Sequence, residues 1–237
     1  MNHQEKIPER RKFLVAAGTT GALAAAAPIV SAQTMATVGN KPPPTPHAFV
    51  FFSAQEAAFV QAAIDVFIPK DEVGPGALEC DVDVCMDLQL AGAYGAAARQ
   101  FMAGPYSPGT PEQGYQLPLT PAEVYRVVIP EIDAVCEREY GGRTFSRLNS
   151  AERNDVLNRM RENKLSVPSG LARAFLSILY NGCVTGYFAD PIYGGNRDKA
   201  AWKMIGFPGP FRNYSGEIAR HRGRKFVAEP KSIADLI

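Results

Sequence analysis

Apolar residues recur at intervals of three and four along most of the chain after residue 53, which is the pattern of helices with one buried face. Two helices begin with a clear capping signal. Ser53 is followed three positions later by Glu56, and Thr120 by Glu123, with Pro121 at the first helical position. The expected helices cover residues 53–68, 77–90, 95–103, 120–140, 150–163, 169–186 and 199–204.

Stretches rich in proline and glycine separate these helices. Residues 71–76 contain Gly-Pro-Gly, residues 104–118 hold four prolines and three glycines, and the chain becomes irregular after residue 186. The sequence shows no alternating pattern typical of strands and no internal repeat. It therefore predicts an all-α fold, a single helical domain with long irregular loops.

The N-terminus has the three parts of an export signal. The twin arginines Arg10 and Arg11, followed by Phe13 and Leu14, are typical of the address for exporting proteins that are already folded. A weakly apolar run follows that is too short to span a bilayer well, and small residues predict cleavage after Ala32. Because these parts occur in the right order, we favour a cleaved signal over an uncleaved anchor or a chance Arg-Arg pair. We expect a soluble mature protein in the periplasm of a two-membraned bacterium.

The predicted signal divides the chain into a leader and a globular part. Residues 1–32 are the signal, residues 33–50 are a proline-rich linker or arm, and residues 51–237 form the helical domain. The signal holds four of the 25 basic and two of the 24 acidic residues, which leaves 21 basic and 22 acidic residues and a formal charge of −1. This near-neutral balance argues against a nucleic-acid partner.

The chain lacks the motifs of a cofactor-binding protein. No Cys-x-x-Cys-His run attaches haem, and no Gly-x-Gly-x-x-Gly follows a strand to bind a flavin or nicotinamide nucleotide. The mature chain keeps only His47 and His221, too few for a zinc site or a histidine-centred acid–base site. We therefore expect no catalytic residue, no metal ligand and no cofactor in this chain.

The chain has four cysteines, Cys80, Cys85, Cys136 and Cys183. In an oxidising compartment they allow two disulfides with three pairings. Cys136 and Cys183 lie on the apolar faces of their helices, so they either bridge a helix pair or are simply buried. Cys80 and Cys85 are about 140° apart around a regular helix and do not easily bond to each other. The spacing of the four cysteines matches no common pattern of iron–sulfur ligands, so purely structural thiols are favoured.

Two charged clusters have simple explanations. Residues 220–225, Arg-His-Arg-Gly-Arg-Lys, are interpreted as a solvated tail in preference to a docking patch for an acidic partner surface. Asp81, Asp83 and Asp87 are interpreted as a solvated helix face.

Two loops near the end of the domain have an unusual composition. Residues 186–196 read Gly-Tyr-Phe-Ala-Asp-Pro-Ile-Tyr-Gly-Gly-Asn, and residues 202–209 read Trp-Lys-Met-Ile-Gly-Phe-Pro-Gly. These two loops resemble the small (third, gamma) subunit of gluconate 2-dehydrogenase and of related membrane-bound flavin-dependent sugar dehydrogenases. Residues 68–77, residues 89–95 and the pair Gly104-Pro105 share the resemblance. The resemblance covers roughly residues 50–212.

The resemblance implies a complex. A large subunit with FAD oxidises the sugar or sugar acid, a multihaem cytochrome c with haem c accompanies it, and a cytochrome or quinone accepts the electrons. The small subunit carries no redox centre and is not catalytic alone. It stabilises the folded flavin subunit, which lacks its own signal, and carries it through the twin-arginine exporter. The complex is then periplasmic and associated with the inner membrane through partner subunits.

The aromatic loops are the candidate contact with the large subunit. Rigid aromatic side chains are enriched in interface cores, and neighbouring glycines permit backbone shapes closed to other residues. The candidate interface residues are Tyr187, Phe188, Asp190, Tyr193, Asn196, Trp202 and Phe207. On burial grounds alone, these loops are equally expected to fold back as an internal plug on the helices.

Two further hypotheses belong to other functional classes. Asp190, Tyr193, Asn196 and Trp202 are suitable sugar ligands, so the chain is alternatively an independent periplasmic carbohydrate-binding helical protein. An enzyme acting alone is less favoured, because no acidic pair is marked by its spacing.

Overall fold

The computed structural model describes residues 48–107, 109–110, 113–210 and 213–236. The chain divides into two units, Met1–Pro46 and His47–Ile237, and all described residues belong to the second. The predicted signal with Arg10, Arg11, Phe13 and Leu14, and most of the predicted arm, lie outside the described residues.

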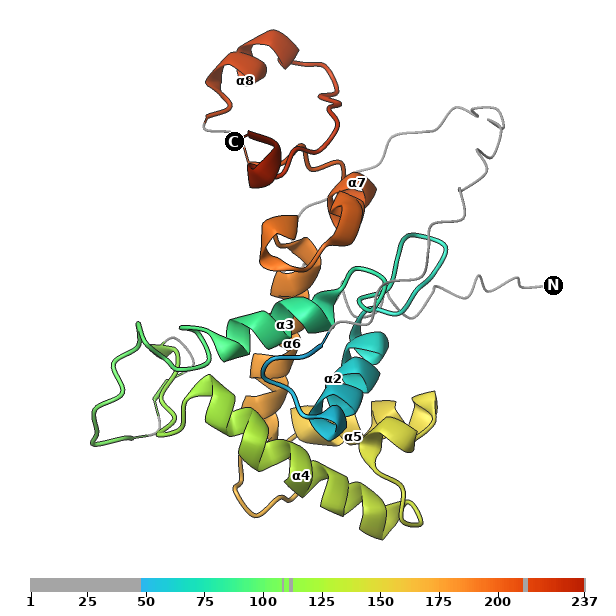
Figure 1. Cartoon of the computed structure of the whole chain (residues 1–237), viewed down its shortest axis with the longest axis vertical. Helices are drawn as coiled ribbons and strands as arrows, with labels where there is room; N and C mark the ends of the chain where they lie inside the picture. The colour runs from blue at the N-terminus through green and yellow to red at the C-terminus, as the bar shows by residue number, and fades with distance from the viewer. Residues whose placement is uncertain (1–47, 108, 111–112, 211–212, 237) are drawn as a thin grey trace, which may run out of the picture. The chain divides into compact units, whose positions relative to one another are not determined.

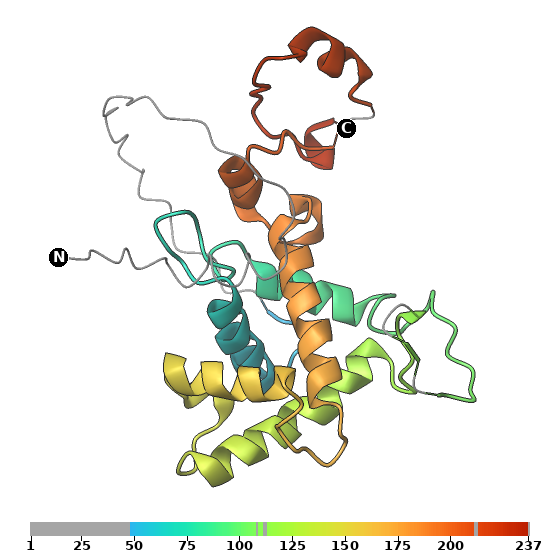
Figure 2. The same cartoon turned by 180° about the vertical axis from the view of Figure 1, so that it is seen from behind.

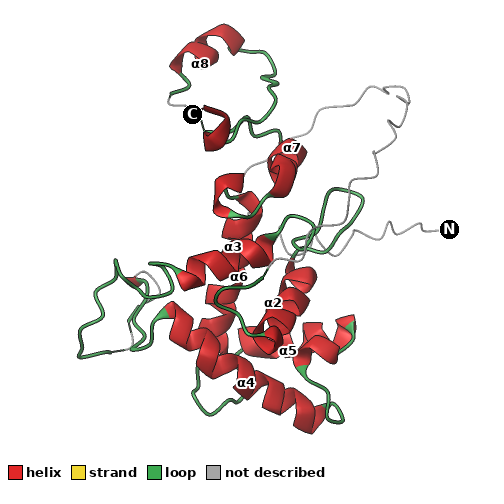
Figure 3. Cartoon of the chain, in the orientation of Figure 1, coloured by secondary structure: helices red, strands yellow, loops and turns green. Residues whose placement is uncertain are grey.

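The described residues are helices joined by loops, with no strand among them (Figure 3). The prediction of an all-α fold is therefore confirmed. The α-helices are α2 (Ala54–Phe67), α3 (Val82–Ala91), α4 (Pro121–Glu139), α5 (Ser150–Arg161), α6 (Ala172–Phe188), α7 (Ala200–Ile205) and α8 (Ser215–His221). Short 3-10 helices are η2 (Phe145–Arg147), η3 (Pro191–Tyr193), η4 (Arg197–Lys199) and η5 (Ile233–Leu236).

Capping boxes fix the starts of three helices. At α2 the Ser53 side chain accepts a hydrogen bond from the Glu56 amide (3.3 Å), and the Ser53 amide donates to the Glu56 carboxylate (2.8 Å). The same reciprocal pair starts α4, as the sequence predicts. A third box, between Asn149 and Glu152, starts α5. Each box satisfies two amides that a helix end leaves without an intrahelical partner.

The central helix of the domain is α6, which packs against α2, α3, α4, α5 and α7 (Figures 1 and 2). Its residue Phe175 lies in a buried aromatic group, with ring centroids 5.0 Å from Tyr125 of α4 and 5.9 Å from Phe59 of α2. Phe59 also stacks on Phe145 of η2 at 4.5 Å. Burial of these large rings, together with the aliphatic side chains around them, stabilises the helical core.

Two glycines let α3 and α6 approach closely. A Cβ atom added at Gly186 would lie 3.1 Å from Val82 Cγ1, and one added at Gly182 would lie 3.2 Å from Met86 Cε. Both distances are shorter than ordinary van der Waals contact. The Gly-x-x-x-Gly spacing places both glycines on the same face of α6, against α3.

The main differences from the predicted helices lie around α3. The predicted helix over residues 77–90 begins only at Val82, because Asp81 has a positive φ of 55° that a right-handed helix does not permit. Instead of the predicted helix over residues 95–103, residues 95–99 form turns and residues 100–103 are irregular, with Ala97 at φ 51°. The helix α8 was not predicted, because its seven residues contain only one large apolar side chain.

Candidate partner interface

The seven candidate interface residues lie along a stretch that runs from the last turn of α6 through α7 to the loop beyond it. They divide into a buried set and an exposed set. Tyr187, Asp190, Asn196 and Trp202 are buried within this chain, whereas Phe188, Tyr193 and Phe207 are partly exposed.

Asn196 holds the segment between η3 and α7 in shape. Its side chain is fully buried; Nδ2 donates to the Ala189 carbonyl (2.9 Å), and the Ala201 amide donates to Oδ1 (2.9 Å). Its φ of 47° lies in the left-handed region, which asparagine tolerates better than most residues. The adjacent Gly195 allows close backbone approach, because a Cβ there would lie 2.1 Å from the Gly186 carbonyl oxygen.

Asp190 connects the same segment to the C-terminal part of the chain. Its carboxylate accepts hydrogen bonds from the Ser232 hydroxyl (2.8 Å) and the Ile233 amide (2.8 Å), and it also caps η3 through the Ile192 amide (3.0 Å). A buried carboxylate with three donors is a structural group, because its hydrogen bonds replace the water that it has lost.

Tyr187 and Trp202 also direct their polar atoms inward. The Tyr187 hydroxyl donates to the Pro75 carbonyl (2.8 Å), and Trp202 Nε1 donates to the Phe188 carbonyl (2.8 Å). For these two residues, and for Asp190 and Asn196, the structure shows the internal-plug arrangement. These four residues therefore hold the loop that carries the exposed side chains.

The exposed set includes two neighbours that sequence reasoning missed. Phe188, Tyr193 and Phe207 are 40%, 57% and 37% exposed, and Ile192 and Ile205 are also exposed. We name these five residues the apolar rim. A partner contact of Phe188, Tyr193 and Phe207 remains a prediction. A count of apolar residues in the two loops would have found the isoleucines.

A second exposed apolar surface lies in residues 92–118, the long connection between α3 and α4. Phe101 is 89% exposed, and Tyr94 and Tyr106 are also exposed. A hollow of about 560 Å³ lies beside them, lined by Phe101, Pro105, Tyr106, Tyr115 and others of this loop. Sequence reasoning treated this stretch only as irregular, although its density of aromatic residues was a usable signal.

The carbohydrate-binding alternative finds little support in this geometry. Three of its four proposed ligands, Asp190, Asn196 and Trp202, are buried and use their polar atoms for hydrogen bonds within the chain. Only Tyr193 presents an exposed ring. A sugar pocket needs several polar groups that converge on an open space, which these side chains do not provide.

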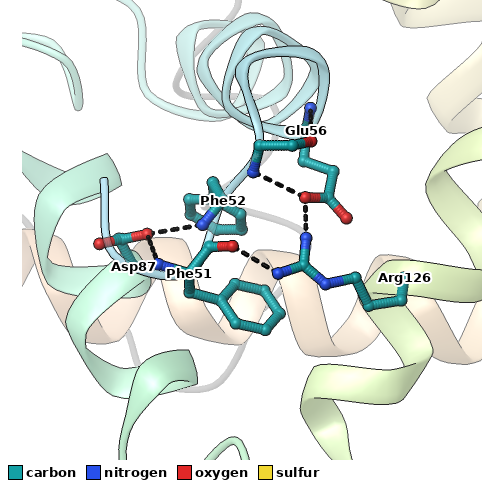
Figure 4. Close-up of polar contacts among 6 residues, drawn as sticks. Phe51, Phe52, Glu56, Asp87 and Arg126 are labelled. Carbon is teal, nitrogen blue, oxygen red and sulfur yellow. Dashed lines mark hydrogen bonds and ion pairs between the residues drawn. The ribbon is translucent and has the colours of Figure 1, made fainter. Parts of the chain in front are cut away.

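A second structural feature, the N-terminal anchor, fixes the first described residues to α3 (Figure 4). The carboxylate of Asp87 is fully buried and accepts hydrogen bonds from the amides of Val50 (2.8 Å), Phe51 (2.9 Å) and Phe52 (2.8 Å). Asp83 is buried as well, and Asp81 is partly buried and paired with Arg197, so the interpretation of Asp81, Asp83 and Asp87 as a solvated helix face was wrong. Helical spacing placed Asp87 on the inner side, where three backbone amides compensate its burial.

Arg126 of α4 completes the anchor from the other side. It pairs with the Glu56 carboxylate, donates to the Phe51 carbonyl, and lies 4.0 Å above the Phe51 ring (Figure 4). Burial works against the charged form of Glu56, but the hydrogen bonds from Arg126 and Ser53 outweigh it. They hold the pKa of Glu56 below its usual range.

The side chains of all four cysteines are buried in the described domain. The pairing of these cysteines remains a prediction. Burial, with nearby acids at Cys136, raises the pKa of Cys136 and Cys183 to about 12. These thiols are therefore poor nucleophiles at neutral pH.

Two other kinds of feature are absent from the described residues. Within residues 48–236, apart from the few that are not described, no group of three or more His, Cys, Asp or Glu side chains could hold a metal ion. In the same residues, no helix is long and apolar enough to cross a membrane.

Comparison with known proteins identifies the family. The family model for gluconate 2-dehydrogenase subunit 3 matches residues 54–209, which is most of the chain. The chain belongs to the gluconate 2-dehydrogenase subunit 3 family. Membership supports a role as a small subunit of a dehydrogenase complex. The matched region starts at α2 and ends just beyond the apolar rim. No curated protein and no solved structure matches the chain.

Proposed function

We propose that this chain is the non-catalytic small subunit of a periplasmic flavin-dependent gluconate or sugar dehydrogenase complex. In this role it stabilises the flavin subunit and carries it through the twin-arginine exporter. The observation that carries the proposal is the family match over residues 54–209. The twin arginines at Arg10 and Arg11 support it, because they are typical of export in the folded state.

The proposed partners supply the redox chemistry. A large subunit holds FAD and oxidises the sugar or sugar acid, and a multihaem cytochrome c holds haem c and passes the electrons on. The complex is periplasmic and is associated with the inner membrane through these partners. This chain binds neither cofactor; its own contribution is a rigid surface.

The apolar rim is the proposed contact with the flavin subunit. Phe188, Tyr193 and Phe207 are aromatic and exposed, and they are presented by a loop that buried hydrogen bonds hold rigid. A pre-ordered loop loses little conformational freedom on binding, so burial of its aromatic side chains translates efficiently into affinity.

The export role is tested by changing Arg10 and Arg11 together to Lys. If the chain carries the flavin subunit, dye-linked dehydrogenase activity in the periplasmic fraction is lost, while the flavin polypeptide accumulates in the cytoplasm. Periplasmic activity at the wild-type level would show that the flavin subunit is exported independently.

The contact is tested by purification of the chain through a tag placed after Ile237, followed by an absorption spectrum of the eluate. We expect a large co-purifying polypeptide with flavin bands. Tyr193→Ser should lower its recovery several-fold, whereas Val127→Ser, a partly exposed position on α4, should not. Equal recovery with both variants would remove the apolar rim from the interface. A lone colourless chain would contradict the proposal as a whole.

A further inference from the structure

Beyond the matched region, the chain carries a rigid basic turn. The Arg224 amide donates to the His221 carbonyl (2.8 Å), Arg222 has φ −53° and ψ 120°, and Gly223 has φ 73°. These values are those of a type II turn with glycine at its third position. The rings of His221 and Phe226 lie 4.9 Å apart across the base of the turn. We name residues 222–225, Arg-Gly-Arg-Lys, the basic turn.

The basic turn belongs to an arm, residues 213–230, that has little core of its own. None of its residues from 213 to 229 is buried. Figures 1 and 2 show α8 and the chain around it as an open loop beyond α7. An arm that buries so little apolar surface contributes almost nothing to the stability of the domain. Stability of the domain therefore does not explain why the arm has a defined structure.

The base of the arm is firmly closed onto the rest of the domain. The Lys231 amide donates to the Pro208 carbonyl (3.0 Å), and Asp190 holds Ser232 and Ile233. Gly209 has φ 99°, and a Cβ there would lie 2.0 Å from the Lys231 carbonyl oxygen. The two ends of the arm are thus fixed side by side, so the arm is held out as a loop and is not a free tail.

Only some of the basic side chains of the arm form ion pairs. Arg220 is paired with Glu217 at 2.8 Å within α8. By contrast, Arg222, Arg224 and Lys225 are exposed and form no ion pair with any other described residue. Three unpaired cations within four residues concentrate positive charge at one place on the surface, which attracts a surface rich in carboxylates.

We propose that the basic turn docks onto an acidic surface, a cluster of Asp and Glu carboxylates, on the large subunit of the dehydrogenase complex. This inference rests on the proposed function, because it takes the flavin subunit as the partner. The planar guanidinium groups of Arg222 and Arg224 match carboxylates in a two-point geometry, and the fixed turn presents them without further ordering. The turn steers the two subunits together, and the apolar rim supplies the buried contact.

A protein surface fits the arm better than a membrane. Helices that lie on anionic lipid insert a broad apolar face into the headgroup region. α8 has seven residues, and Ile218 is its one exposed large apolar side chain. Val227 is also exposed but lies outside α8, so the arm offers cations in a defined geometry without a broad apolar face to insert.

The test compares two variants of the full mature chain with equal loss of charge. The first is Arg222→Gln, Arg224→Gln, Lys225→Gln. The control is Arg138→Gln, Arg147→Gln, Arg173→Gln, three exposed arginines on α4, η2 and α6. Association with the purified flavin subunit is followed at 50 and 500 mM NaCl, and binding to phosphatidylglycerol vesicles is measured in parallel. We expect association of the first variant to be about tenfold slower at low salt, with the difference largely gone at high salt. The control should keep the wild-type rate.

Two outcomes would overturn the docking proposal while the proposed function stands. One is that both variants associate at the wild-type rate and with the same salt dependence. The other is that the first variant loses vesicle binding but keeps normal association, which would make lipid the ligand. If the wild-type chain itself fails to bind the flavin subunit, the proposed function fails and the docking proposal fails with it.

Discussion

Replacement of Asp87 by Ala should be among the most destabilising substitutions in the domain. The carboxylate is fully buried on α3 and accepts three backbone hydrogen bonds, from Val50, Phe51 and Phe52, at 2.8–2.9 Å. Alanine removes all three acceptor contacts at once. The amide of Phe52 is buried, so it would be left without a partner and without water.

The size of the effect follows from the nature of these bonds. A hydrogen bond to a charged group contributes about 1.5–3 kcal/mol, and bonds that share one acceptor are less than additive. Val50 and Phe51 are more exposed than Phe52, so water compensates part of their loss. We therefore expect a loss of roughly 3–5 kcal/mol in the free energy of unfolding. For a domain of this size, that corresponds to a fall in Tm of about 10 °C.

The assay is thermal and urea unfolding of the mature chain, followed by circular dichroism. The matched control is Asp83→Ala on the same helix, because Asp83 is also buried but accepts a side-chain bond from Gln61 (2.7 Å). We expect the control to lose about 1 kcal/mol. If Asp87→Ala cost no more than the control, residues 50–52 would have to detach without affecting the core, and the anchor would not be a structural element.

Three further substitutions or measurements test other parts of the domain. Asn196→Ala should cost roughly 2–3 kcal/mol, because it removes one donor and one acceptor in a fully buried site; a thermal shift within 1 °C would contradict this. The pKa of Glu56 is lower in the folded state than in the unfolded state, where it is about 4.3. The ionised Glu56 therefore stabilises the fold above that pH, and this stabilisation is lost as the pH falls through the folded-state pKa. Arg126→Met should therefore flatten the dependence of stability on pH between about 5 and 3, and an unchanged slope would remove the pair from this role. Burial and raised pKa values should keep Cys136 and Cys183 unlabelled by a thiol reagent at pH 8 until urea unfolds the chain, and rapid labelling of the native protein would show that they are accessible.

The starts of α2 and α4 were predictable from the sequence because their capping boxes depend on neighbouring residues. Ser53 with Glu56, and Thr120 with Glu123, form their capping boxes as expected. The predicted helix over residues 95–103 failed because the alanine-rich sequence favours a helix only weakly, and tertiary packing decided its form. The amide of Ala122 at the start of α4 donates to the Gly95 carbonyl (3.1 Å), which holds these turns in place.

The burial of polar side chains was not predictable in the same way. Asp87, Asp190 and Asn196 each bind backbone groups, and Asp87 and Asp190 do so with segments at least 35 residues away. Local pattern shows only that such residues are polar, which is typical of an exposed position. Composition did correctly mark the aromatic loops as unusual, but the division between buried Trp202 and exposed Tyr193 depends on the path of the chain.

Asp87 and Asp190 each hold a segment of the chain that lies outside the region matched by the family model. Asp87 holds residues 50–52, which directly precede residue 54, and Asp190 holds residues 232–233, well beyond residue 209. The helical core thus supplies the acceptors, and the flanking segments supply the backbone donors. Val50 is the last residue of the predicted proline-rich arm, so its hydrogen bond to Asp87 ties the end of that arm to the helical core.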